Sequence, residues 1–247
     1  SRGVGVAVVS AVLLFSHLQL RADQWQFIKA FPDTSITKGN TVHGLAVDPE
    51  GKLWVQFWNA MPGDSVQEAN GTKTPVRAIY IFDKNGNNVS FSPITILSGA
   101  GVHDTLFVTP TSRAVTNRGL TRDHQGNILA SVFDALYRID YKTGTVLKKM
   151  QPFPNTALTA PAVDGDGDIV IGTVLPGNPL KIFDKDFNYL GNVTDVANGY
   201  SRSVAVSKDG KDVYYAGYTL HAVQWYHSTN GVLGPYVLAD TILKGFD

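Results

Sequence analysis

The chain contains no cysteine, and this absence excludes several kinds of site. A protein without cysteine has no disulfide scaffold, no thiolate nucleophile, and no cysteine-ligated zinc or iron–sulfur cluster. An excess of charge of one sign is also missing, because 21 Lys and Arg balance 21 Asp and Glu. A neutral chain with 17% charged residues lacks the basic surface of a nucleic-acid-binding protein. We therefore expect no nucleic-acid partner.

Long apolar runs are scarce, and the clearest one lies at the amino terminus. Residues 3–15 are mostly apolar, follow Arg2, and are followed by a more polar sequence that reaches Ala22. A basic start, a short apolar stretch and a small residue are typical of a secretory signal. If the run continued to Leu20, it could instead form an uncleaved membrane anchor; a buried strand is a third reading. We expect residues 1–22 to be a signal peptide or anchor, and the rest to lie outside the cytoplasm, either periplasmic or secreted.

A short pattern recurs along the remainder of the chain. An apolar stretch leads to Asp or Ser, then to a glycine three residues later, and then to a second apolar stretch. The marker glycines are Gly51, Gly126, Gly167 and Gly210, spaced 75, 41 and 43 residues apart. Glycine supplies the positive φ that a tight hairpin requires. Another pair of expected strands follows each hairpin, beginning at Ile79, Leu136, Leu180 and Val223.

Four strands in roughly 40–45 residues is the period of a β-propeller blade. Residues 23–247 are therefore predicted to form one all-β domain with about five visible blades. The wide first interval indicates long insertions at 59–76 and 98–115. We expect Trp25–Phe31 to be a closing outer strand and Tyr236–Asp247 to begin another blade. The propeller would then be part of a six-bladed ring, incomplete at its carboxyl end.

Two segments, HGLAVDPEGKLWV at 43–55 and SVAVSKDGKDVYY at 203–215, carry a family resemblance. They resemble the NHL and SMP-30-like six-bladed β-propellers, and the resemblance covers most of the chain after residue 40. It implies the propeller fold described above. The apolar run at the amino terminus is separately expected to form a helix that precedes the propeller. The resemblance implies no single function, because the family includes lactonases, lyases, ligand sensors and interaction platforms.

The lactonases of that family hold a divalent metal with a Glu, an Asn and an Asp at particular strand ends. In this chain His43 stands where the early carboxylate is wanted, and only Asn117 and Asp134 offer a pair of oxygen ligands. Two such ligands without a third carboxylate make a poor site for a hard cation. The run DGDGD at 164–168 imitates a calcium loop, but Leu175 replaces its final Glu. We expect a hairpin turn there and no cofactor, with calcium as the alternative.

Polar residues at strand starts and in neighbouring loops are expected to meet at one mouth of the propeller channel. The candidate ligand-binding residues are His43, Trp58, Asn59, Arg118, Asp134, Arg202, Tyr218 and His221. Guanidinium and imidazole groups suit an anionic or polar ligand. The alternative is that these side chains bond to one another and to channel water.

Catalysis has two candidate residues, His43 and Asp134. A lyase would need a histidine base held close to its proton, but the chain's histidines share no motif. We therefore expect an exported propeller that binds a protein partner or a small polar ligand without catalysis. One alternative is a hydrolase or lyase acting at the channel mouth. Another is an accessory subunit of a membrane-associated complex, anchored by residues 3–20. The polar insertion Met61–Pro75 would be a partner contact or lid.

Overall fold

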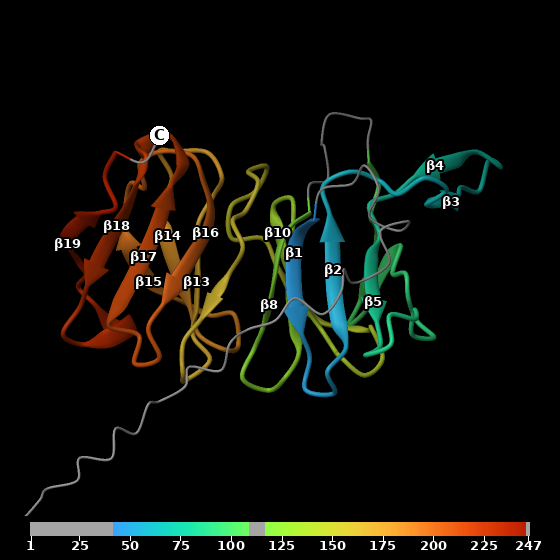
Figure 1. The fold of residues 1–247 in the computed structure, drawn as a ribbon, viewed down its shortest axis with the longest axis horizontal. Helices are drawn as coiled ribbons and strands as arrows, with labels where there is room; N and C mark the ends of the chain where they lie inside the picture. The colour runs from blue at the N-terminus through green and yellow to red at the C-terminus, as the bar shows by residue number, and fades with distance from the viewer. Residues whose placement is uncertain (1–41, 109–116, 246–247) are drawn as a thin grey trace, which may run out of the picture. The chain divides into compact units, whose positions relative to one another are not determined.

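The structure is a computed structural model that describes residues 42–108 and 117–245 (Figure 1). Its contacts divide the chain into a unit of Ser1–Ala30 and a unit of Phe31–Asp247, and all described residues belong to the second unit. The predicted leader with its apolar helix, and the predicted strand Trp25–Phe31, lie outside the described residues. Within the described part, no helix has the length and apolar character needed to cross a membrane.

Four antiparallel sheets follow one another along the chain. The first contains β1 (Val42–Val47), β2 (Leu53–Phe57) and β5 (Ile79–Phe82). The second contains β8 (Asn117–Arg122), β9 (Ile128–Val132), β10 (Ala135–Ile139) and β11 (Val146–Met150). The third contains β12 (Ala162–Val163), β13 (Ile169–Ile171), β14 (Leu180–Phe183) and β15 (Tyr189–Thr194). The fourth contains β16 (Ser201–Val206), β17 (Asp212–Gly217), β18 (Ala222–His227) and β19 (Val237–Ile242).

These sheets have the strand order of propeller blades, so the all-β propeller prediction is confirmed at that level. Four blades are seen in the described residues; the five visible blades and the six-bladed ring stay predictions. The only helical segments among the described residues are two 3₁₀ turns, η1 (Tyr218–Leu220) and η2 (Gly231–Leu233).

The insertions predicted in the first repeat form two separate hairpins. The first consists of β3 (Ser65–Gln67) and β4 (Lys73–Pro75), and the second of β6 (Ile96–Gly99) and β7 (Val102–Thr105). The first blade has three strands, and isolated bridges pair β5 with Asn88 and Ile94 in place of a regular fourth strand. The polar insertion at Met61–Pro75 is thus largely an exposed hairpin.

The Asp-x-x-Gly sequence closes the hairpin between the first two strands of a blade. Asp48 Oδ1 accepts hydrogen bonds from two backbone amides, including that of Lys52 at 2.9 Å. Gly51 donates its N–H to the carbonyl of Asp48 and has a φ of +79°. Asp123 and Asp164 accept equivalent pairs of hydrogen bonds in the next two blades. The carboxylate satisfies the turn amides and the glycine supplies the left-handed conformation.

Apolar clusters join neighbouring blades. Trp54 of the first blade and Ile128 of the second are fully buried in one cluster. Leu136 of the second and Ile169 of the third belong to another, and a further cluster joins the third and fourth blades. Burial of each large apolar side chain contributes about 1.5–3 kcal/mol. These clusters fix the order of the blades.

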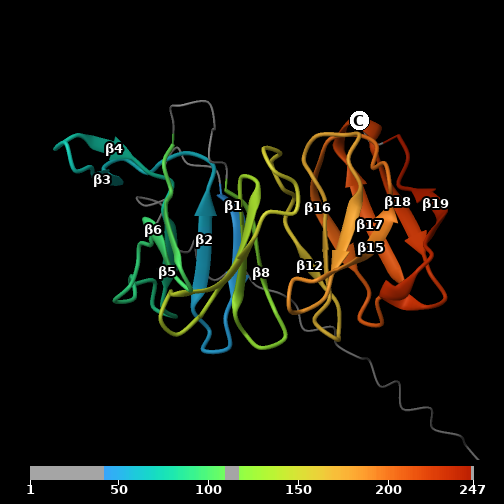
Figure 2. The same cartoon turned by 180° about the vertical axis from the view of Figure 1, so that it is seen from behind.

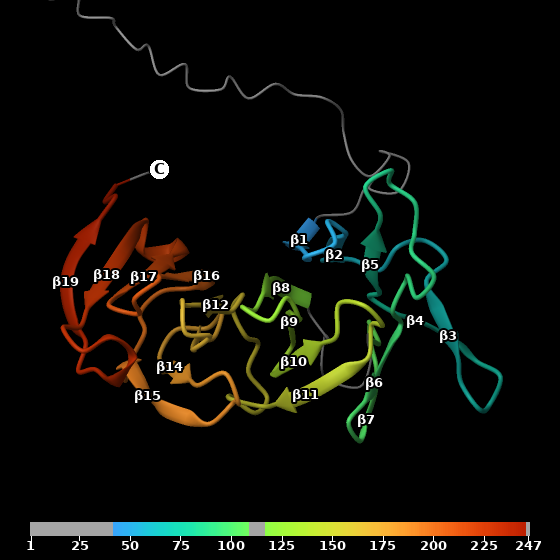
Figure 3. The ribbon, with the colours of Figure 1, turned by 90° about the horizontal axis from the view of Figure 1, so that it is seen from below.

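The innermost strands of neighbouring blades lie side by side. β1 contacts β8, β8 contacts β12, and β12 contacts β16 (Figures 2 and 3). The approach is close, because a Cβ added at Gly119 would lie 2.3 Å from the Cβ of Ala160. Residues near the start of each inner strand are thereby brought close to the inner strand of the next blade.

The carboxyl-terminal prediction was wrong. Val237–Ile242 does not begin another blade; it forms β19, the outer strand of the fourth blade, and pairs with β18. Its first four residues are exposed, so the strand has little of the apolar alternation that marks a half-buried strand. Main-chain pairing with β18 determines the position of this segment, which is therefore the outer strand of the fourth blade.

Candidate functional site

Three inner strands share an irregularity near their first residues. The pairing of β1 with β2 shifts register at His43, and that of β8 with β9 shifts at Arg118. The pairing of β16 with β17 shifts where Arg202 lies. Register shifts of this kind re-aim a side chain and are over-represented beside functional sites. The first, second and fourth blades therefore each present a basic side chain near the start of the inner strand.

These side chains meet around Trp58, which directly follows β2. The Cζ atom of Arg118 lies 4.3 Å from the centre of the Trp58 ring, and that of Arg202 lies 5.7 Å from it. A third guanidinium, from Arg77, lies 5.8 Å from the same ring, and the His43 ring is centred 4.7 Å away. We call these five residues the arginine cluster. Contacts of a guanidinium with an indole face are each worth about 0.5–2 kcal/mol.

Hydrogen bonds hold the cluster across blades that are distant in sequence. Arg202 Nη1 lies 3.4 Å from His43 Nε2, which links the fourth blade to the first. The backbone carbonyl of Arg202 accepts a hydrogen bond from the amide of Ala160, which links it to the third blade. The position of Arg202 is therefore set by two neighbouring blades as well as by its own strand.

The cluster concentrates positive charge. Burial, followed by repulsion from Arg202 and Arg77, lowers the pKa of Arg118 to about 10. Burial also lowers the pKa of Arg77, whose exposed fraction is 8%. Converging guanidinium groups raise the local potential for an anion.

Arg77 was not among the residues predicted from sequence. It precedes β5, and its amide donates a hydrogen bond to the carbonyl of Leu106. Because insertions on either side interrupt the repeat pattern, the sequence does not show which repeat position Arg77 occupies. The available signal was a charged residue two positions before the apolar strand Ile79–Phe82, next to a segment expected to be buried, where a charged side chain needs a specific reason.

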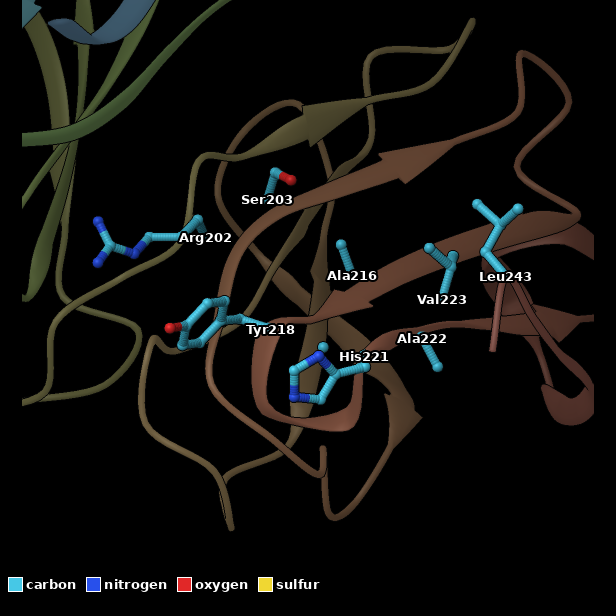
Figure 4. Close-up of a pocket in the computed structure, with 9 residues that line it drawn as sticks. Arg202, Ser203, Ala216, Tyr218, His221, Ala222, Val223 and Leu243 are labelled. Atoms are coloured by element: carbon cyan, nitrogen blue, oxygen red, sulfur yellow. The ribbon is translucent and has the colours of Figure 1, made fainter. Parts of the chain in front are cut away.

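Arg202 also lines a second feature, an open pocket of about 540 Å³ on the fourth blade. We call it the apolar pocket; its lining residues are Arg202, Ser203, Ala216, Gly217, Tyr218, His221, Ala222, Val223 and Leu243. Figure 4 shows the Arg202 guanidinium and the Tyr218 hydroxyl pointing to the same side, away from Val223 and Leu243. Tyr218 and His221 thus share this pocket with Arg202. Tyr218 is 75% exposed.

Asp134 lies in a different pocket, one of about 170 Å³ that is also lined by Asp104, Tyr137 and Lys149. Asp134 Oδ2 accepts a hydrogen bond of 2.8 Å from the amide of Asn155. Asp104 accepts hydrogen bonds from the Tyr137 hydroxyl and Lys149 Nζ. Burial and these carboxylates raise the pKa of Tyr137 above its ordinary value. The groups of this pocket largely satisfy one another.

The remaining candidate residues converge less than those of the arginine cluster. Asn59 is exposed beside Trp58, and Asn117 begins β8 opposite Val132. No group of three or more His, Asp or Glu side chains within residues 42–108 and 117–245 could hold a metal. The hairpin turn predicted at 164–168 is confirmed, because the Asp164 amide donates to the carbonyl of Asp168.

Comparison with known proteins supports the fold. No protein-family model matches the chain, and no curated protein matches it either. A solved structure of a protein of unknown function from Bacteroides caccae matches with a TM-score of 0.50 and 12% identity, covering 82% of this chain and 62% of that one. Virginiamycin B lyase from Staphylococcus aureus matches with a TM-score of 0.49 and 11% identity, over 82% and 71%. The chain thus spans about three fifths of the length of the first of these structures, and the first match supports a propeller fold.

Proposed function

We propose that the protein is a non-catalytic β-propeller that binds a small anion at the arginine cluster. The observation that carries this proposal is the convergence of three guanidiniums on Trp58 from three different blades. Carboxylate, sulfate and phosphate groups accept paired hydrogen bonds from guanidinium, which gives such a site both affinity and orientation.

Binding is favoured over the hydrolase or lyase alternative by the contacts of the two catalytic candidates. His43 contacts Trp58 and Arg202, whereas Asp134 contacts Asn155 and lines a separate pocket. An acid–base pair would need both groups within hydrogen-bonding reach of one substrate.

We also propose a family, a location and a partner-binding element for the protein. We place the protein among the NHL and SMP-30-like six-bladed propellers, because its described blades repeat a hairpin turn of the form Asp-x-x-Gly or Ser-x-x-Gly. We propose export from the cytoplasm, since residues 1–22 have the composition of a leader or anchor. We propose that the exposed β3–β4 hairpin contacts a protein partner. If the protein is an accessory subunit of a membrane-associated complex, the same hairpin would contact that complex.

The anion-binding proposal is tested by calorimetric titration of the full chain with sodium sulfate at constant ionic strength. Arg118→Gln and Arg202→Gln should each weaken sulfate binding at least tenfold, as expected for loss of a charge-assisted pair worth about 1.5–3 kcal/mol. Arg122→Gln is the matched control, because Arg122 lies at the other end of β8 and is exposed. Equal binding by all variants, or no binding by the unmodified chain, would overturn the proposal.

A further inference from the structure

We propose that the anion held by the arginine cluster is the head group of an amphipathic organic acid whose apolar part occupies the apolar pocket. This inference rests on the proposed function and adds the chemical class of the ligand. It is carried by the position of Arg202, which belongs to the cluster and to the pocket wall.

Arg202 joins the two features directly. Its guanidinium lies 5.7 Å from the Trp58 ring and 3.4 Å from His43 Nε2. The same residue lines the pocket, and its guanidinium and the Tyr218 hydroxyl point away from Val223 and Leu243 (Figure 4). A carboxylate that pairs with the Arg202 guanidinium would therefore have to extend its apolar group back along the Arg202 side chain to reach the pocket.

The pocket walls suit that apolar group. Ala216, Val223 and Leu243 supply aliphatic surface, while Arg202 and His221 are the basic residues of the lining. The described lining contains no Asp or Glu, so none of its side chains repels an acid. A volume of about 540 Å³ falls within the range usual for small-molecule sites, which are mostly apolar with a few polar groups that fix orientation.

The polar part of the rim adds selectivity. Tyr218 is exposed and His221 adopts a left-handed conformation with a φ of +47° directly after η1. Non-glycine residues in this conformation are uncommon and deserve a structural reason. Here the conformation turns the chain back into β18 and places the imidazole at the pocket, where it can meet the head group.

The test is a titration of the full chain with straight-chain carboxylates from acetate to octanoate, all below their micelle concentrations. If the apolar part enters the pocket, affinity rises with each added methylene, by up to about fourfold when the methylene is fully buried. Ala216→Leu fills part of the pocket and should remove most of this rise. Ala205→Leu, at an exposed position on β16 outside the pocket, should keep it.

The outcomes separate this inference from the proposed function. If sulfate binds and Arg118→Gln weakens it, but affinity does not change with chain length, the apolar part has no place in the pocket and the inference is overturned while anion binding stands. Carboxylate affinities that Arg202→Gln leaves unchanged at every chain length would also overturn the inference, because the head group would then not pair with Arg202. If neither sulfate nor any carboxylate binds, both proposals fail.

Discussion

At the scale of single residues, the molecule uses its charged side chains in two ways. Some are paired in the core, as Arg138 Nε is with Asp123 Oδ2 at 2.9 Å. Others, as in the arginine cluster, are brought together with like charges. Four members of that cluster were predicted from the sequence. His43, Arg118 and Arg202 lie at the starts of expected inner strands, and Trp58 lies just past the end of the second strand of its blade. Arg77 was not predicted, because its position in the cluster depends on how the insertions fold.

The buried pair gives a direct stability prediction. Arg138→Met should destabilise the protein by about 3–5 kcal/mol at pH 7, because it leaves the Asp123 carboxylate buried without its partner. Urea denaturation followed by circular dichroism measures the change. Lys149→Met is the comparison: it breaks the more exposed pair with Asp104 and should cost less than about 1 kcal/mol. Equal losses in the two variants would contradict this account of the buried pair.

The lowered pKa of Arg118 predicts a proton linkage. The folded-state pKa lies near 10, below the ordinary value of 12.5, because burial and positive neighbours disfavour the charged form. A bound anion favours the charged form and raises that pKa again. Sulfate binding near pH 10 should therefore take up protons, and affinity should fall as the pH rises through 10. At pH 7 Arg118 is already charged and contributes no uptake.

Calorimetry in buffers of different ionisation enthalpy measures this uptake. The Arg122→Gln protein should show the same linkage as the unmodified chain. Proton uptake that is equal at pH 7 and pH 10 would count against Arg118 as an anion ligand.

At the scale of elements, the hairpins are the part that sequence predicted best. Asp48 and Gly51 act within five residues of one another, so the turn follows from local chemistry. The strand at Val237–Ile242 was misassigned for the opposite reason: its place depends on β18, a partner that local pattern does not reveal. The register shifts at His43, Arg118 and Arg202 likewise arise from pairing and have no signature in the sequence.

Gly51 provides a clean test of the turn. A Cβ at this position would meet nothing within 4 Å, so Gly51→Ala changes only the backbone preference at φ +79°. We expect a loss of about 1–2 kcal/mol in unfolding free energy, measured by urea denaturation. Gly51→Asn should lose less, since asparagine tolerates the left-handed region. An unchanged stability in Gly51→Ala would show that the turn does not need this conformation.

At the scale of the whole described domain, the arginine cluster exists because blades distant in sequence are neighbours. The period of the repeat predicted propeller blades, but spacing alone could not say which side chains meet. Their meeting depends on the close contact of inner strands, where Gly119 lies against Ala160. The small residues at that contact allow the inner strands to approach closely, and this approach positions the side chains of the arginine cluster.

Gly119→Ala tests the contact. The added Cβ would lie 2.3 Å from the Ala160 Cβ, so the inner strands of the second and third blades must separate. We expect a loss of about 1–3 kcal/mol in stability together with weaker sulfate binding, because Arg118 is adjacent. Adding Ala160→Gly removes the clashing methyl group and should recover part of both. A stable Gly119→Ala protein with unchanged sulfate affinity would show that inner-strand spacing does not govern the site.

The most direct measurement of the central claim is anomalous diffraction from crystals of the full chain grown with sodium selenate. The account predicts a selenium peak within hydrogen-bonding reach of the guanidiniums of Arg118 and Arg202, beside Trp58. That peak should be absent from crystals of Arg118→Gln and present in those of Arg122→Gln. Selenate bound elsewhere, with no peak at the arginine cluster of the unmodified chain, would contradict the account.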